Sequence, residues 1–179
     1  MPHHAHLNPH LTVDRSRAFV LVGPIGAGKS TLFNHLFDRP DEVHKTQAVE
    51  YEADIGLDTP GEFFSHPRLY HALINTASDV GILVYVQGAD DFNCRMPPGL
   101  LGVYRDKQVL GVITKIDLPE ADPDRVEAQM RENGISGPIF RVSSQVPASL
   151  QPLKSLLAGP AGQWTAGFVH DGHSQEISP

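Results

Sequence analysis

The stretch from Gly23 to Ser30, GPIGAGKS, decides the fold. It fits the phosphate-binding pattern G-x-x-x-x-G-K-[ST] at every fixed position. Glycines let such a loop curl around phosphates with its N–H groups turned inward, and the following helix adds its positive N-terminal end. We expect Lys29 to reach the β and γ phosphates of a nucleoside triphosphate and the Ser30 hydroxyl to bind Mg²⁺. The predicted nucleotide-binding residues here are Gly23, Gly26, Ala27, Gly28, Lys29, Ser30 and Thr31.

Strand and helix patterns alternate outward from this loop. Ala18 to Val22 is a short, continuous apolar run, which is typical of a strand buried on both faces, and Lys29 to Phe37 has the apolar spacing of a helix. Further strands are predicted over Ala53–Leu57, Val80–Val86, Val109–Thr114 and Ile139–Val142, and further helices over Leu69–Ala77, Pro123–Asn133 and Leu150–Leu157. This alternation predicts an α/β fold with a central, mostly parallel sheet and helices on both faces.

A second motif, Asp58-Thr59-Pro60-Gly61, follows a predicted strand about thirty residues after Lys29. A carboxylate at a strand end beside the phosphate loop can hold Mg²⁺, usually through water. We therefore predict Asp58 as a metal residue, and Gly61 as a backbone N–H that senses the γ-phosphate. The motif alone is weak, since Pro-Gly turns are common after strands.

A third motif, Thr114-Lys115-Ile116-Asp117, ends the strand Val109–Thr114 and fits the guanine-reading pattern [NT]-K-x-D. A carboxylate can accept two hydrogen bonds from guanine, at N1–H and the exocyclic amine, whereas adenine offers no such donor pair. We expect Asp117 to read guanine while the stem of Lys115 lies along the base. Ser143 and Ser144 close the next strand, and their backbone N–H groups are candidates to contact the guanine oxygen.

These elements, in this order and spacing, resemble a Ras-like small GTPase domain, a P-loop NTPase with a three-layer fold. Between and beyond them the chain is similar to the EutP/PduV family, over roughly Ala18 to Leu157. The segments that carry this narrower resemblance are Lys45–Tyr51 (KTQAVEY), Asp58–Phe64 (DTPGEFF), His66–Leu73 (HPRLYHAL), Val84–Asp90 (VYVQGAD) and Arg95–Leu101 (RMPPGLL).

The resemblance implies a bacterial, cytoplasmic accessory protein of ethanolamine or propanediol utilization, associated with metabolic microcompartments. It implies GTP and GDP with Mg²⁺ as ligands, and a microcompartment shell protein or an enzyme as partner. Members of the ethanolamine branch have also been assigned acetate kinase activity, which would mean ATP and phosphoryl transfer to a carboxylate. The Thr114–Asp117 motif stands against that alternative, because it would serve no purpose with adenine.

Two residues are predicted to act on the γ-phosphate, together with Lys29. Thr46 is the candidate switch threonine that closes on Mg²⁺ and the γ-phosphate, although only about a dozen residues separate it from Asp58. That short spacing predicts a stubby hairpin for the second and third strands. Glu62 stands where Ras-like proteins orient water with Gln. Its charge would oppose the transition state, so we expect slow hydrolysis.

Composition limits the alternatives. The 179 residues hold 14 Lys and Arg against 21 Asp and Glu, and the resulting net charge of -7 argues against nucleic acid as the main partner. Cys94 is the single cysteine, which suits a reducing cytosol, and no apolar run is long enough to span a bilayer. We expect a flexible His-rich leader over 1–17, one domain over 18–158 and a flexible tail over 159–179.

Overall fold

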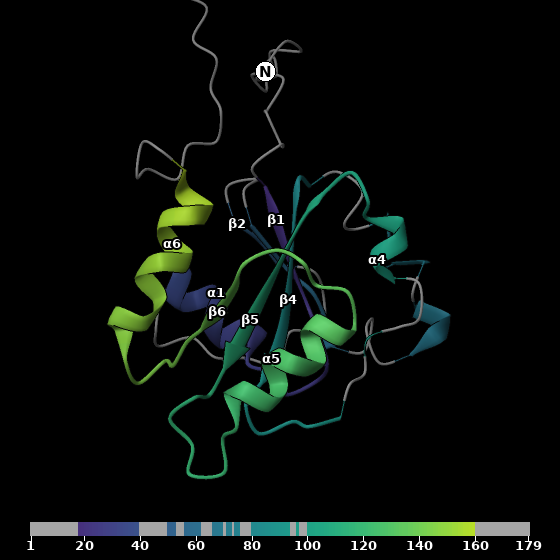
Figure 1. Ribbon diagram of the computed structural model, residues 1–179. Helices are drawn as coiled ribbons and strands as arrows, with labels where there is room; N and C mark the ends of the chain where they lie inside the picture. Colours follow the sequence, from purple (N-terminus) through teal and green to yellow (C-terminus); the bar gives the residue numbers. More distant parts are fainter. Residues whose placement is uncertain are drawn as a thin grey trace, which may run out of the picture.

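The computed structural model describes residues 18–39, 50–52, 56–61, 66–69, 71–72, 74–75, 80–93, 96 and 100–159. Its centre is a six-stranded sheet in the order β2-β3-β1-β4-β5-β6, with β2 antiparallel and the other strands parallel (Figure 1). The strands are β1 Phe19–Val22, β2 Glu50–Glu52, β3 Gly56–Asp58, β4 Ile82–Gly88, β5 Gln108–Thr114 and β6 Ile139–Arg141. The helices are α1 Lys29–Leu36, α4 Leu100–Val103, α5 Pro123–Glu132 and α6 Gln151–Ala158, with short 3-10 turns η2 Pro67–Leu69 and η3 Pro147–Leu150.

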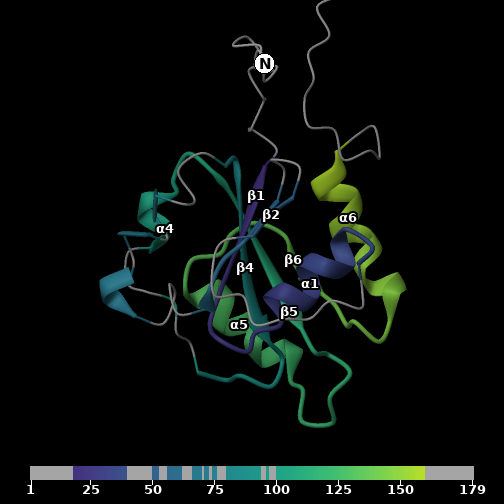
Figure 2. The same ribbon diagram turned by 180° about the vertical axis from the view of Figure 1, so that it is seen from behind.

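The two faces of the sheet bury separate hydrophobic clusters. Along β1 the side chains alternate, so that Phe19 and Leu21 enter one cluster while Val20 and Val22 enter the other. The first cluster includes residues of α1 and α6, and the second includes residues of α4 and α5. Accordingly α5 lies in front of the sheet in Figure 1, and α1 lies in front of it in Figure 2. The predicted three-layer α/β fold is confirmed, and burial on both faces explains the continuous apolar strands.

The helix α1 begins where the predicted phosphate loop ends. Gly28 occupies its N-cap position with φ 83°, a left-handed conformation that glycine adopts without steric cost. The buried face of α1 carries Leu32, Phe33 and Leu36, as the sequence predicts, and it ends at a cap on Phe37. The loop and the helix therefore follow β1 directly and stand at the carboxyl end of the parallel strands.

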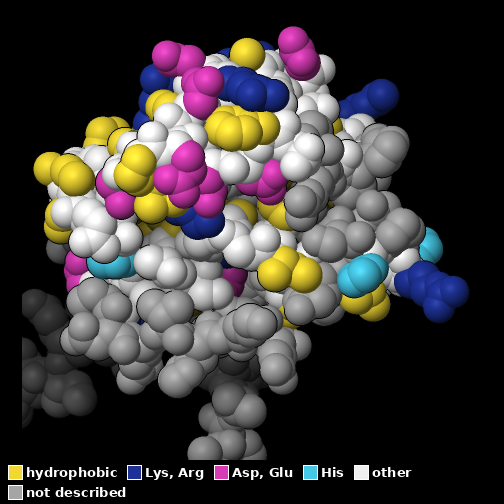
Figure 3. Space-filling view, turned by 90° about the horizontal axis from the view of Figure 1, so that it is seen from below, with side chains coloured by type: hydrophobic (Ala, Val, Ile, Leu, Met, Phe, Trp, Pro, Cys, Tyr) yellow, Lys and Arg dark blue, Asp and Glu magenta, His cyan; other side chains and the backbone are white. Residues whose placement is uncertain are grey.

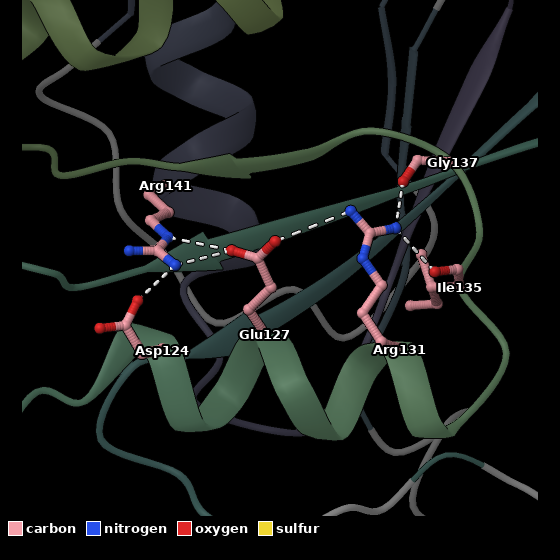
Figure 4. Close-up of polar contacts among 6 residues, drawn as sticks. All are labelled: Asp124, Glu127, Arg131, Ile135, Gly137 and Arg141. Atoms are coloured by element: carbon pink, nitrogen blue, oxygen red, sulfur yellow. Dashed lines mark hydrogen bonds and ion pairs between the residues drawn. The ribbon is translucent and has the colours of Figure 1, made fainter.

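The helix α5 is capped and then held to the sheet edge by charges. The Asp122 side chain accepts the Arg125 N–H at 3.0 Å, and Pro123 opens the first turn. Figure 4 shows that Arg141 of β6 reaches two carboxylates of α5, donating to Asp124 at 2.6 Å and to Glu127 at 2.8 Å. These contacts fasten the edge strand β6 to the helix that precedes it.

The same network continues toward the end of α5. The other carboxylate oxygen of Glu127 lies 3.7 Å from Arg131, whose guanidinium donates to the carbonyl oxygens of Ile135 and Gly137 at 2.8 and 2.6 Å (Figure 4). Helix, connecting loop and strand are thus joined by one chain of polar contacts.

Several predicted boundaries shift in the structure. The strand predicted over Ala53–Leu57 is β3 at Gly56–Asp58. It pairs with β2 in the short hairpin that was predicted, and each strand has three residues. The strand predicted over Val80–Val86 is β4 at Ile82–Gly88, so it begins and ends two residues later than predicted. The helix predicted from Leu69 is preceded by the turn η2, and α4 was not predicted at all.

Some predictions fall outside the described residues. Among these are the switch residue Thr46, the catalytic candidate Glu62, the single cysteine Cys94, the leader over 1–17 and the tail from residue 160 onward. In the part of the chain that the structure describes, none of the helices combines the length and apolar character needed to span a lipid bilayer.

Candidate functional site

The phosphate loop connects β1 to α1 and depends on three glycines. A Cβ at Gly23 would lie 2.1 Å from the carbonyl oxygen of Val86 in β4, so the loop can leave the sheet there only without a side chain. Gly26 and Gly28 have φ values of 79° and 83°, which side chains disfavour. The loop therefore has the tight backbone curl that the sequence pattern predicts for phosphate binding.

Lys29 is 6% exposed and lies over this loop. Its ammonium donates to the carbonyl oxygens of Gly23 and Pro24, both at 3.0 Å. The backbone thus holds this buried cation against the loop that is predicted to bind phosphate.

The end of β3 lies beside the phosphate loop. Asp58 is fully buried and is in register with Leu21 of β1, and the Thr59 hydroxyl donates to the Leu21 carbonyl oxygen at 2.7 Å. A Cβ at Gly61 would lie 2.7 Å from the Cα of Ile25, in the middle of the loop. The D-x-x-G motif is thus in direct contact with the phosphate loop.

The donor set at this point suits Mg²⁺. Ser30 at the start of α1 and Asp58 at the end of β3 supply only oxygen atoms, which a hard cation prefers. In the described residues no group of three or more His, Cys, Asp or Glu side chains is placed to hold a metal ion. A Mg²⁺ ion at this point would be held by Ser30 and Asp58.

The guanine-reading motif begins at the end of β5 and touches the phosphate loop. The Thr114 hydroxyl donates to the Ala27 carbonyl oxygen at 2.6 Å. Lys115 follows with φ 59°, an unusual left-handed conformation for a residue with a side chain, and its ammonium pairs with Asp90 at 3.0 Å. The two motifs are consequently parts of one site.

Asp117 is oriented by the next strand connection. The Ser143 hydroxyl donates to the Asp117 carboxylate at 2.5 Å, a short, charge-assisted hydrogen bond. The backbone N–H of Ser143 donates to the Ser149 hydroxyl at 2.9 Å. Ser143 thus faces the carboxylate through its side chain, while its backbone N–H, the group predicted to contact guanine, is used within the protein.

A pocket of about 330 Å³ opens between the first turns of α1 and the loops after β5 and β6. Six predicted nucleotide-binding residues take part in lining it, namely Gly28, Thr31, Thr114, Lys115, Asp117 and Ser144. The sequence reading missed its remaining lining residues Leu32, His35, Leu118, Val142 and Leu150. These residues show no motif of their own, and the fold brings them together: Leu32, Val142 and Leu150 share one hydrophobic cluster.

The carboxyl ends of the strands face the viewer in Figure 3. From this side, acidic and basic side chains are interspersed among hydrophobic and uncharged ones. No broad basic area is visible among the described residues on this face.

A phosphate loop after β1, a buried carboxylate after β3 and an oriented carboxylate after β5 define a P-loop protein with the Ras-like GTPase fold. The chain belongs to the PduV-EutP family, described as "Ethanolamine utilisation - propanediol utilisation", which matches residues 16–158. The resemblance noted from the sequence motifs is therefore confirmed.

Two named relatives support this membership. The chain is 44% identical to "Probable acetate kinase EutP" of Escherichia coli strain K12, covering 84% of this chain and 95% of that protein. It is 33% identical to "Propanediol utilization protein PduV" of Citrobacter freundii, covering 62% of this chain and 71% of that protein.

Solved structures agree with the fold. The chain is similar to translation elongation factor SelB of Methanococcus maripaludis, solved with the GTP analogue GppNHp, at TM-score 0.56 and 18% identity, covering 78% of this chain and 32% of that chain. It is also similar to a probable GTP-binding protein EngB at TM-score 0.57 and 15% identity, covering 76% of this chain and 94% of that one. At these identities the likeness establishes the fold alone.

Proposed function

We propose that this protein binds GTP and GDP with Mg²⁺ and hydrolyses GTP slowly, as a switch that serves ethanolamine or propanediol utilization. The observation that carries the proposal is Asp117, whose carboxylate lines the pocket and accepts the Ser143 hydroxyl at 2.5 Å. A carboxylate has further acceptor sites beyond that bond. Guanine N1–H and its exocyclic amine match them, while adenine would leave a costly unpaired acceptor.

Phosphates and metal would meet at the other end of the site. Lys29 contacts the β and γ phosphates, and Ser30 and Asp58 hold Mg²⁺, which supplies charge neutralisation for the phosphates when it is bound. The N–H of Gly61 senses the γ-phosphate. Thr46 joins this metal in the triphosphate state, so that the segments around Thr46 and Glu62 would differ between the GTP and GDP forms.

Hydrolysis is proposed to be slow for two reasons. Glu62 adds a negative charge beside an anionic γ-phosphate, which opposes the transition state. Ile25 is 50% exposed in the phosphate loop and lies against Gly61, which supports crowding of the space for an attacking water. A single-turnover rate above about 1 s⁻¹ without a partner would contradict this part of the proposal.

The test changes the one side chain that is proposed to recognise the base. Asp117→Asn replaces an acceptor with an amide donor, which mismatches the 2-amino group of guanine and matches the 2-oxo group of xanthine. We expect the wild type to bind GDP far more tightly than ADP, and Asp117→Asn to lose GDP about 100-fold while gaining XDP, measured by equilibrium titration with Mg²⁺. A gain cannot arise from misfolding. Wild-type ADP binding as tight as GDP binding would refute guanine recognition.

The names of the Escherichia coli and Salmonella typhimurium relatives favour one second candidate, an ATP-dependent acetate kinase. It would transfer the γ-phosphoryl group of ATP to an acetate oxygen, giving acetyl phosphate and ADP. The protein is incubated with ATP and acetate, and hydroxylamine traps any acetyl phosphate as a hydroxamate. Hydroxamate formed by the wild type but not by Lys29→Ala would support this candidate. If the protein forms no more hydroxamate than a control without protein, the acetate kinase candidate is rejected and the GTPase proposal stands.

The family description also supports a proposal for the cellular setting. We propose a cytoplasmic protein that associates with a microcompartment, with a shell protein or pathway enzyme reading its nucleotide state. The family description supports the pathway, and a partner that binds the GTP form more tightly than the GDP form would support the switch.

A further inference from the structure

The turn after β4 contributes a carboxylate that no motif of the sequence marks as functional. Asp90 holds the Lys115 ammonium with both oxygens, at 3.0 and 3.3 Å. The side chains of Lys115 and Asp90 are 36% and 26% exposed, so the pair is partly shielded from solvent. It links the loop after β4 to the residue whose stem is predicted to lie along the base.

A series of hydrogen bonds, made in part by buried side chains, holds the turn after β4 in place. At the end of β4 the Tyr85 hydroxyl donates to Gln87 at 3.0 Å, and the Gln87 amide donates to the Asp91 carbonyl oxygen at 2.6 Å. Gln87 is 1% exposed, and the Asp91 N–H returns to the Gly88 carbonyl oxygen at 3.1 Å. The backbone around Asp90 is therefore fixed by contacts that reach into the core.

The glycine at the end of β4 makes room for the pair. A Cβ at Gly88 would lie 2.2 Å from an Asp90 carboxylate oxygen and 3.5 Å from the Cδ of Lys115. Both partners thus pass over a position that only glycine leaves open. Together with the left-handed backbone at Lys115, this aims the ammonium at Asp90.

The position of Lys115 matters because another carboxylate stands two residues away. Asp117 must keep acceptor sites for a ligand, yet an ammonium in the same loop is a strong competing donor. We infer that Asp90 is a positioning residue for guanine recognition: it holds Lys115 along the base and keeps its ammonium away from Asp117. This inference rests on the proposed function, and it explains how the Asp117 carboxylate keeps its acceptor sites for guanine.

The test is a double-mutant cycle on GDP affinity with Mg²⁺. Asp90→Asn keeps the size of the side chain and removes its charge. We expect GDP to bind about fivefold more weakly to Asp90→Asn, with a smaller GDP-over-ADP ratio, as for loss of one partly buried ion pair. In a Lys115→Met background the same change should alter GDP affinity less than about twofold, because its target is gone.

Glu127→Gln provides the matched control. Glu127 is 30% exposed and pairs with Arg141 at 2.8 Å, outside the pocket, so its loss should leave GDP affinity within about twofold of wild type. Should Asp90→Asn fail to fold, as judged by thermal unfolding, Asp90→Ser enters the same cycle.

The outcomes separate the two ideas. Unchanged GDP affinity in Asp90→Asn, or equal weakening in both backgrounds, overturns the positioning role while a guanine-selective wild type leaves the proposed function standing. A wild type that does not prefer GDP to ADP overturns both.

Discussion

Gly61 shows how closely two predicted motifs meet at the scale of one residue. An added Cβ would lie 2.7 Å from the Cα and 2.8 Å from the backbone N of Ile25, distances at which the backbone must move. We expect Gly61→Ala to cost about 1–3 kcal/mol of unfolding free energy, as overpacking usually does. Thermal unfolding measures this as a Tm lower by about 2–4 °C for each kcal/mol.

Gly102 provides the comparison for that substitution. It lies in α4, and a Cβ there would meet nothing within 4 Å. Gly102→Ala should be neutral or stabilise by up to about 1 kcal/mol, because alanine favours helix. Equal Tm values for Gly61→Ala and wild type would show that the loop tolerates a side chain at this contact.

The sequence predicted those residues of the candidate site that belong to a motif, and it did not predict those that depend on contacts between loops. Asp117 and Thr114 could be recognised because their chemistry and spacing form a motif. Asp90 could not, because its partner Lys115 lies 25 positions away and the pairing depends on how two loops meet. The Ser143 hydroxyl is a similar case, since sequence reading pointed to its backbone instead.

Among the elements, α5 and β6 are joined by a network of charged side chains. Hydrogen bonds to Glu127 and then to Asp124 raise the pKa of the Arg141 guanidinium, so it stays charged at any pH of interest. Arg141→Met keeps the apolar stem and removes these bonds. We expect a loss of about 1 kcal/mol in thermal or urea unfolding, shrinking in high salt as screening weakens the wild-type network.

An isolated pair tests whether the network matters. Lys154 of α6 pairs at 2.7 Å with Asp38, whose side chain is 86% exposed. Lys154→Met should therefore change stability little, because single exposed pairs contribute almost nothing. Equal losses for the two variants would remove the case for a special role of the α5–β6 contacts.

The boundaries of elements were hardest to predict where a polar residue is buried or an element is very short. The strand β4 continues past Val86 because Gln87, a polar residue, is buried and satisfied by Tyr85 and Asp91. The helix α4 has four residues, too few for any periodicity to show. By contrast α5 was predicted closely, since Pro123, Asn133 and Gly134 mark its ends.

The whole molecule should lose stability in alkali through a tyrosine in its core. Burial raises the pKa of Tyr104 to about 12, from 10.0. Below pH 10 the phenol is neutral in both states and has no effect. Between about pH 10 and 12 the unfolded chain ionises first, so the unfolding free energy falls by up to roughly 1.4 kcal/mol per pH unit.

Tyr104→Phe isolates this contribution, because phenylalanine keeps the ring without the titrating group. In urea unfolding across pH 9–12, the variant should lose less stability per pH unit than wild type, so that the gap between them changes through this window. Parallel curves for the two proteins would mean that Tyr104 ionises as easily in the folded chain as in the unfolded one.

The hydrogen bond from Thr114 to the Ala27 carbonyl oxygen spans 87 positions of the chain and joins the segment predicted to read the base to the segment predicted to bind the phosphates. The two halves of the site are therefore not interchangeable modules. A base-reading segment without a hydroxyl at position 114 would leave the Ala27 carbonyl oxygen without this bond, so a change in one half of the site has consequences for the other.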